Sequence, residues 1–297
     1  MFKCLSAEAL GVSCGQSELI ELALSYGFKG IELDLVDFVE QVKSQGLPKA
    51  RRLLDSAKLK IASFHLPLDI EADDDVFRTQ IQRLPDWATA AAEMKCTRAL
   101  VRIAPASDFR PFHQNFELHR SRLTEIARLV EPSGIRLGLG FQAASEVRQG
   151  KAFEFIRGLD ALLMLLSVLN ARNVGVVLDL WDLYASGGSL DAIRKLSADK
   201  IVAVQLADAA NDAAADGWPA TSRVLPGETG LIDAAGALAM LAELGYDGPV
   251  IPLPHVSRLA GMRRDAIVKL AGEKLDQVWK AAGLNPAGKL ATSAARR

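Results

Sequence analysis

Short apolar runs recur along the 297-residue chain, and longer amphipathic segments separate them. A run of about four to seven apolar residues is too short for a helix and indicates a buried strand. The best example is Val174–Asp179, which ends on an acid. The eight predicted strands are Phe2–Leu5, Lys29–Leu33, Leu59–His65, Arg98–Ile103, Ile135–Phe141, Val174–Asp179, Ile201–Leu206 and Gly248–Leu253.

The segments between these runs have the spacing of amphipathic helices. The first opens on Ser17 and is followed by Gly27, which are typical start and stop signals. Gly46 and Pro48 predict a break in the second. The predicted helices are Ser17–Tyr26, Val36–Ser56, Val76–Met94, Phe112–Val130, Phe153–Asn170, Ser189–Leu196, Ile232–Leu244 and Ala260–Ala282.

Strands that alternate with helices favour a parallel sheet covered by helices. Eight such units in slightly under 300 residues favour a closed barrel. The alternative is an open doubly wound sheet, whose glycine-rich turn the spacing of Gly11 and Gly15 does not match. We therefore predict an α/β protein with a single (β/α)8 TIM barrel over residues 1–284, including an extra C-terminal helix, and a flexible tail over residues 285–297.

The composition narrows the class of partners. Lys and Arg total 35 and Asp and Glu total 36, so no net field attracts nucleic acid or an anionic membrane. The three cysteines form no CxxC pair, which argues against a disulfide framework and fits a reducing compartment. The N-terminus lacks a signal-peptide pattern, and no apolar stretch is long enough to span a membrane. We expect a cytoplasmic protein that binds neither nucleic acid nor membrane.

Candidate polar residues fall where predicted strands end. The C-terminal ends of barrel strands meet at one mouth, where such enzymes keep their active sites. Asp179 ends the sixth strand and Asp182 follows it, while Gln205 and Asp208 stand at the end of the seventh. The alternative is that the aspartates cap turns and that Gln205 is satisfied by backbone groups.

Four segments carry a family resemblance. VGVVLDLWDLYASGG, IVAVQLADA, RVLPGETGLID and LGYDGPVIPLP resemble, in this order, the xylose isomerase-like barrels, which are the sugar isomerase and epimerase superfamily. The superfamily also includes the endonuclease IV-type DNA repair enzymes. The resemblance extends from about Phe2 to Leu284, and RVLPGETGLID with GYDGPV is its most specific part. It implies a TIM barrel that acts on a sugar or sugar derivative.

The resemblance also implies a divalent cation, which would be manganese, magnesium, cobalt or zinc. In active relatives it is held by a Glu ending strand five, an Asp ending strand six, a His or Gln ending strand seven and a Glu ending strand eight. The two glutamates move protons on adjacent carbons of the sugar, as base and acid. Carried over, the metal ligands would be Asp179 and Gln205, if a metal is bound. In an active enzyme with a rearranged site, Asp179 and Asp182 would be the catalytic carboxylates.

This chain departs from that pattern at both glutamates. Gly140 stands at the first position, with Gln142 as the nearest polar substitute, and Leu253 stands at the second. Asp182 replaces a His that many relatives have. One carboxylate and one amide hold a hard cation poorly, because such ions require several oxygen ligands. We therefore expect no metal cofactor, with a divalent cation as the alternative.

The resemblance also assigns ligand-binding residues. His65 matches a position that lines the sugar pocket, and Arg223 resembles an arginine that reaches a substrate hydroxyl or phosphate, as its donor fork suits. Trp181 could form an apolar wall for a sugar face, and His255 could offer a nitrogen beyond strand eight. The predicted substrate-binding residues are His65, Gln142, Trp181, Gln205, Asp208, Arg223 and His255.

Four other polar residues fall on the predicted strands and helices. Glu32 and Arg102 could face the pocket or pair with each other inside the barrel. His113 and His119 fall on a predicted helix and are expected to be solvated.

Three functional hypotheses follow from the sequence. The first is a protein that binds a carbohydrate or sugar phosphate at the barrel mouth, with the family's metal site largely lost. The alternative is an active isomerase, epimerase or dehydratase with a rearranged site around Asp179, Asp182 and Gln205. The third, DNA repair of the endonuclease IV type, needs many His ligands and a basic groove, which four His and a net charge of −1 oppose. Dimers are common among such barrels, so a homodimer is a further hypothesis.

Overall fold

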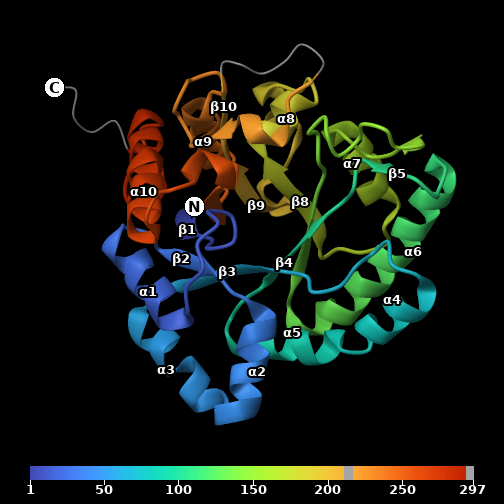
Figure 1. The fold of residues 1–297 in the computed structure, drawn as a ribbon, viewed down its shortest axis with the longest axis horizontal. Helices are drawn as coiled ribbons and strands as arrows, with labels where there is room; N and C mark the ends of the chain where they lie inside the picture. The colour runs from blue at the N-terminus through green and yellow to red at the C-terminus, as the bar shows by residue number, and fades with distance from the viewer. Residues whose placement is uncertain (211–216, 292–297) are drawn as a thin grey trace.

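Eight parallel strands close into a barrel with the order β1-β12-β9-β8-β6-β4-β3-β2, as Figure 1 shows. The computed structural model describes residues 1–210 and 217–291. Neighbouring strands pair in parallel all the way round, so the predicted barrel is confirmed and the open sheet is excluded. The barrel strands are β1 (Phe2–Leu5), β2 (Gly30–Glu32), β3 (Lys60–His65), β4 (Arg98–Arg102), β6 (Arg136–Gly140), β8 (Val174–Asp179), β9 (Ile201–Leu206) and β12 (Pro249–Pro252).

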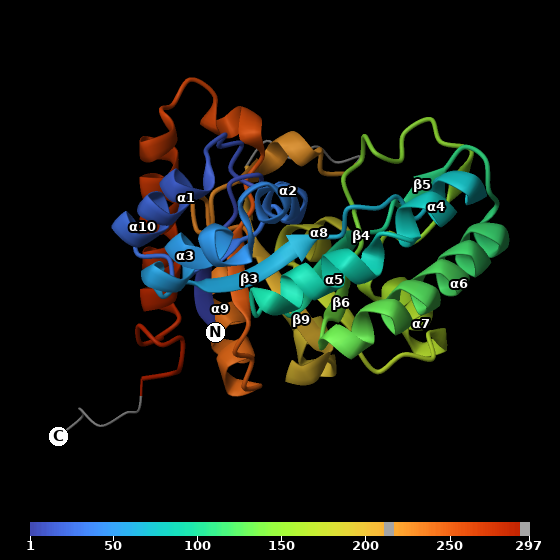
Figure 2. The same cartoon turned by 90° about the horizontal axis from the view of Figure 1, so that it is seen from below.

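Helices surround the barrel, and the last one lies beside the first (Figures 1 and 2). An ion pair of 2.9 Å between Arg264 Nε and Glu18 Oε1 joins these two helices. The helices are α1 (Gln16–Ser25), α2 (Leu35–Gln45), α3 (Leu47–Ala57), α4 (Asp74–Ile81), α5 (Leu84–Glu93), α6 (Phe112–Val130), α7 (Leu159–Val168), α8 (Leu180–Ala185), α9 (Ala234–Glu243) and α10 (Arg264–Ala281). Within the described ranges, no helix combines the length and apolar character needed to cross a membrane.

Three predicted helices differ from the structure. The segment predicted as the short helix Ser189–Leu196 forms a 3-10 helix over Leu190–Lys195. The segment Val76–Met94 is divided into α4 and α5, because Pro85 lies in the first turn of α5, where its missing N–H costs nothing. The segment predicted to be helical from Phe153 becomes helical only at Leu159. Before that, β7 (Phe153–Glu154) pairs with β5 (Ala106–Ser107) in a short antiparallel ribbon.

The barrel interior is filled by small groups of apolar side chains. One group is Phe2, Cys4, Ala62 and Ile251, and another is Leu100, Val177, Val202 and Ala203. Gly138 faces the second group, and a Cβ there would lie 2.9 Å from Val177 Cγ2 and 3.0 Å from Val202 Cβ. The barrel is therefore a packed core, and ligands are confined to its mouth.

The segment around Gly288 lies against the beginning of the chain. The Met1 ammonium is 3.4 Å from the Gly288 carbonyl oxygen, and Ala291 N–H donates to the Gly283 carbonyl oxygen. Of the predicted tail over residues 285–297, residues 292–297 lie outside the described residues, and its flexibility stays a prediction.

A second antiparallel ribbon stands above the barrel. It consists of β10 (Asp208–Ala209) and β11 (Arg223–Val224), with Ala209 opposite Arg223. Because β10 directly follows β9, the ribbon carries Arg223 back over the C-terminal ends of the central strands.

Candidate functional site

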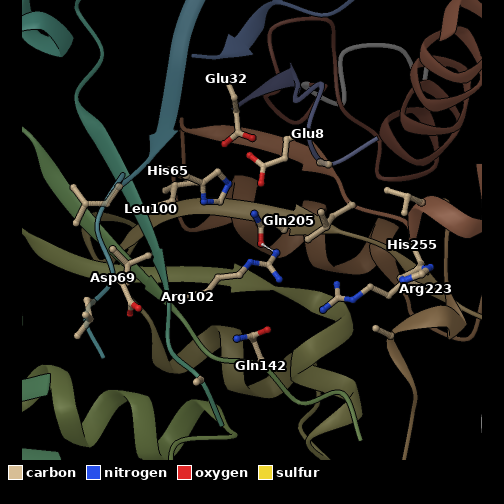
Figure 3. Close-up of a pocket in the computed structure, with 18 of the residues that line it drawn as sticks. Glu8, Glu32, His65, Asp69, Leu100, Arg102, Gln142, Gln205, Arg223 and His255 are labelled. Atoms are coloured by element: carbon tan, nitrogen blue, oxygen red, sulfur yellow. Dashed lines mark hydrogen bonds between the residues drawn. The ribbon is translucent and has the colours of Figure 1, made fainter. Parts of the chain in front are cut away.

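A cavity of about 560 Å³ opens at the C-terminal mouth of the barrel. Polar side chains enter it from the ends of four barrel strands: Glu32 from β2, His65 from β3, Arg102 from β4 and Gln205 from β9. Figure 3 shows Glu32 approaching from one side and Gln142 from the opposite side, with Arg102 and Gln205 between them. Convergent polar groups in a cavity of this size are typical of a small-molecule site.

A buried ion triad lies at one wall of this cavity. Arg223 Nη1 donates to Asp179 Oδ2 at 2.8 Å, and Arg223 Nη2 lies 2.7 Å from Asp182 Oδ2. The guanidinium also stacks on the ring of Trp181 at 4.2 Å. All three charged side chains are less than 9 % exposed, with Asp182 at 1 %. Arg223 therefore covers the carboxylates and separates them from the cavity.

Burial and charge act against each other in the triad. Burial raises the pKa of Asp182 to about 6, even though Arg223 lowers it. Burial disfavours the charged form of Arg223, but the two carboxylates outweigh this effect and raise its pKa. The guanidinium between the two carboxyl groups therefore offsets part of the cost of burying them.

The ribbon that positions Arg223 depends on Asp208. The Asp208 carboxylate accepts hydrogen bonds from three backbone N–H groups of the loop that follows β11, those of Thr229, Gly230 and Ile232, at 2.7 to 3.0 Å. In addition, His255 N–H donates to the Arg223 carbonyl oxygen at 3.1 Å. The structure thus gives Asp208 a supporting role in the loop, and its predicted contact with substrate stays a prediction.

The pocket side of the triad carries a second arginine. Arg102 Nη2 donates to Gln205 Oε1 at 3.0 Å and lies 3.9 Å from Asp179 Oδ2. The Arg102 side chain is 34 % exposed, so other N–H groups of its fork face the cavity. Glu32 accepts from Ser63 Oγ at 2.7 Å. Glu32 and Arg102 therefore both face the cavity and do not pair with each other. Glu32 is bonded to Ser63, and Arg102 is bonded to Gln205.

The residues at the implied metal positions do not fit a divalent cation. Gly140 has no side chain, and Leu253 lines the cavity with an apolar one. Asp179 accepts from Asp182 N–H at 3.1 Å and from Arg223, and the Gln205 oxygen accepts from Arg102. Within residues 1–210 and 217–291, no three His, Cys, Asp or Glu side chains are grouped so as to hold a metal ion. The oxygen atoms that remain already accept hydrogen bonds from N–H groups.

The predicted site residues divide into two sets. His65, Gln142, Gln205, Arg223 and His255 line the cavity. Asp179, Asp182, Trp181 and Asp208 are not among its lining residues. Trp181 is fully buried between Arg223 and Trp218, with ring centroids 5.7 Å apart, so it supports the guanidinium where a wall for a sugar face was expected.

Sequence reasoning missed part of the lining. Glu8, Asp69, Glu71 and His119 also face the cavity. His119 was expected to be solvated, but its exposed fraction is 1 %. The signal was present in the sequence, because His119, Arg122, Leu123 and Ile126 recur with the spacing of one buried helical face.

The sequence matches a family model described as the xylose isomerase-like TIM barrel over residues 20–268. This range covers most of the chain. The chain belongs to this family. The resemblance seen in the sequence is therefore confirmed at the level of the family and the fold.

Individual members are more distant. Inosose isomerase from Bacillus subtilis (strain 168) is 26% identical over 128 residues, which is 43% of this chain and 43% of that protein, so the match spans less than half of the relative. A xylose isomerase domain protein from Alicyclobacillus acidocaldarius superimposes with a TM-score of 0.84 and 22% identity over 95% of this chain and 99% of that one. The IOLI protein, solved with a bound zinc atom, superimposes with a TM-score of 0.78 and 16% identity, and the match covers 95% of this chain and 98% of that one. These structural likenesses show the fold alone.

We predict that Arg223→Met lowers the free energy of unfolding by about 3–5 kcal/mol, because two buried carboxylates lose the guanidinium that compensates their charge. Urea denaturation measures this change. Adding Asp179→Asn and Asp182→Asn to the same variant should recover much of the loss. Arg194→Met removes an exposed ion pair and should cost at most about 1 kcal/mol. If Arg223→Met lowered the free energy of unfolding no more than Arg194→Met does, the role of the triad would be contradicted.

We predict a pH dependence of stability that arises from His119. Burial lowers its pKa to about 4, with smaller opposing effects from the Asn115 carbonyl and Asp69, while Arg110 and Arg122 lower it further. The Glu71 carboxylate also faces the ring. His119 takes up a proton near pH 6.5 in the unfolded chain and only near pH 4 in the folded chain. Its contribution to the free energy of unfolding is therefore present above pH 6.5 and is lost as the pH falls from 6.5 toward 4.

Between pH 7 and pH 5 the contribution of His119 is about 2 kcal/mol. Urea denaturation measures the free energy of unfolding at both pH values. Its fall from pH 7 to pH 5 should be smaller by this amount in His119→Gln than in the wild type. His113→Gln, an exposed position on the same helix, is the control. Equal losses in the wild type and His119→Gln would refute the assignment.

Proposed function

We propose that this protein binds a carbohydrate or a sugar phosphate at the mouth of the barrel, without the divalent cation that its family resemblance implies. The observation that carries the proposal is the convergence of Arg102, Gln142 and Gln205 on one cavity of about 560 Å³. Their guanidinium and amide groups suit the hydroxyl and phosphate oxygens of such a ligand.

The replacement of the cation follows from the buried triad. In a metal-dependent relative, the carboxylates at the centre of the site would face a metal ion. Here Arg223 supplies the positive charge between Asp179 and Asp182, and its fixed fork matches the two carboxylates. A cation would have to displace Arg223 from a buried position, where the unpaired guanidinium would be costly.

The proposal favours binding over the family's proton transfer. The two positions of the family's acid and base are occupied by Gly140 and Leu253, neither of which can move a proton. Arg102 retains donors toward the cavity, and Gln142 Nε2 contacts only the Ile103 carbonyl oxygen, at 3.4 Å, among the described residues. These groups can orient a sugar without reacting with it.

A second candidate function is catalysis by Asp182. Its pKa of about 6 is in the range that suits a general acid or base. A general base must reach the proton it removes, however, and Asp182 is 1 % exposed behind Arg223. Catalysis would require Arg223 to move away from the carboxylate.

We predict that D-fructose or another unmodified hexose binds to the wild-type protein and that Arg102→Gln weakens this binding more than about tenfold. The reason is the loss of charge-assisted hydrogen bonds worth about 1.5–3 kcal/mol. Isothermal titration calorimetry measures the affinity. Arg52→Gln, an exposed arginine on α3, is the matched control and should bind as the wild type does.

The same samples test the second candidate in D₂O. Isomerisation and epimerisation exchange a proton on carbon, so deuterium in the recovered sugar, absent with Asp182→Asn, would favour catalysis over binding alone. Failure of the wild type to bind any hexose, cyclitol or hexose phosphate would contradict the proposed function.

A further inference from the structure

The cavity extends from the barrel mouth to three further polar residues between α6 and the loop after β3. His119 projects from α6, and Asp69 and Glu71 come from the loop between β3 and α4. Figure 3 places Asp69 on the far side of Arg102 from Arg223. None of these three residues takes part in the triad or occupies an implied metal position. They therefore form a separate feature of the same cavity.

The hydrogen bonds of His119 fix which ring nitrogen carries the proton. Nδ1 lies 2.8 Å from the backbone carbonyl oxygen of Asn115, and a carbonyl oxygen can only accept. Nδ1 must therefore be the donor. The buried ring is neutral at pH 7, since its pKa is about 4, so Nε2 carries a bare lone pair.

This lone pair faces another acceptor. His119 Nε2 lies 3.7 Å from Glu71 Oε1, and that oxygen is buried without a hydrogen-bond partner. Burial raises the pKa of Glu71, while a hydrogen bond with the Asn115 side chain and the charge of Arg110 oppose the rise. A donor placed between Glu71 Oε1 and His119 Nε2 would satisfy both facing acceptors.

The loop that carries Glu71 is held firmly in place. The buried Arg122 guanidinium donates to the carbonyl oxygen of Ile70 at 2.6 Å and pairs with Asp74. The Asp69 side chain accepts from Glu71 N–H at 2.8 Å. On its other side, the His119 ring packs on Phe155, with centroids 4.8 Å apart. The two acceptors are thus fixed before any ligand arrives, which reduces the entropy lost on binding.

We propose that Glu71 and His119 form a second binding subsite, which accepts a hydrogen bond from a hydroxyl or protonated amine group of the ligand. The inference rests on the proposed function, because the subsite and the arginine wall share one cavity. A ligand that spans both ends places acceptor oxygens at Arg102 and a donor between Glu71 and His119.

The charges of the residues that line the cavity predict the order in which it binds ligands of different charge. Four carboxylates face the cavity, those of Glu8, Glu32, Asp69 and Glu71. Arg102 and Arg223 oppose them, but Asp179 and Asp182 already neutralise Arg223. The acidic excess favours an amine-bearing polyol over a neutral one and disfavours a phosphorylated sugar.

Calorimetric titrations with D-glucosamine, D-glucose and D-glucose 6-phosphate test the subsite in the full-length protein. We expect the affinities to fall in that order. Glu71→Gln keeps the shape of the side chain and should weaken glucosamine about tenfold and glucose less, because the lost hydrogen bond to the amine is charge-assisted. Glu131→Gln, an exposed acid beyond the end of α6, is the control and should change neither affinity.

A second measurement follows His119 directly. In nitrogen-15 spectra of the wild type, Nε2 should have the shift of an unprotonated nitrogen and should move upfield when the sugar donates to it. Unchanged affinities in Glu71→Gln together with an unmoved Nε2 signal would overturn the subsite and leave the proposed function standing. Tighter binding of the phosphate than of glucose would overturn the ranking by charge. Absence of binding by all three sugars to the wild type would overturn the subsite, whereas the proposed function is overturned only if the wild type also binds no other hexose, cyclitol or hexose phosphate.

Discussion

The site is organised by one buried interaction, the pairing of the Arg223 guanidinium with the carboxylates of Asp179 and Asp182. A charge that leaves water must be compensated by partners at short range, and here each member of the triad compensates the others. The surrounding structure is arranged to maintain this pairing. Trp181 supports the guanidinium from below, the β10–β11 ribbon fixes its backbone, and Asp208 holds the loop that follows the ribbon.

The triad also decides what the cavity can do. Because Arg223 covers both aspartates, the surface that a ligand meets consists of Arg102, Gln142 and Gln205, with acids and histidines further out. In such a cavity, recognition depends on hydrogen-bond donors near the arginines and on acceptors toward α6. In the proposed function, the cavity stays polar without a metal ion, because the Arg223 side chain provides positive charge between the two carboxylates.

The fold was predictable because each strand is a short apolar run and the eight runs alternate with helical segments. Those patterns depend on neighbours in the sequence, as does the end of β8 at Asp179. The errors arose where contacts between distant segments decide the structure. Phe153 was assigned to a helix, whereas its pairing with Ser107 makes it a strand. The split of α4 from α5 at Pro85, by contrast, was visible in the sequence.

The same distinction applies to the site. His65, Gln142 and Gln205 were predicted from their places at or just beyond the ends of predicted strands, and they line the cavity. Arg223 was predicted from the resemblance of the segment that begins at RVLPGETG, and it also lines the cavity. The roles of Trp181 and Asp208 could not be found in this way, since both are set by partners 21 to 42 residues away in the chain. The contact of His119 with Glu71 joins a helix to a loop 48 residues earlier, and no local pattern reports it.

Manganese binding followed by electron paramagnetic resonance tests the central claim most directly. Free Mn²⁺ gives a six-line signal that weakens when the ion binds to a protein. If Arg223 takes the place of the cation, the signal should stay at its free intensity when purified wild-type protein is added in excess. Stoichiometric loss of the signal with the wild type, restored by Asp179→Ala, would contradict the claim and show that a metal ion can displace the guanidinium.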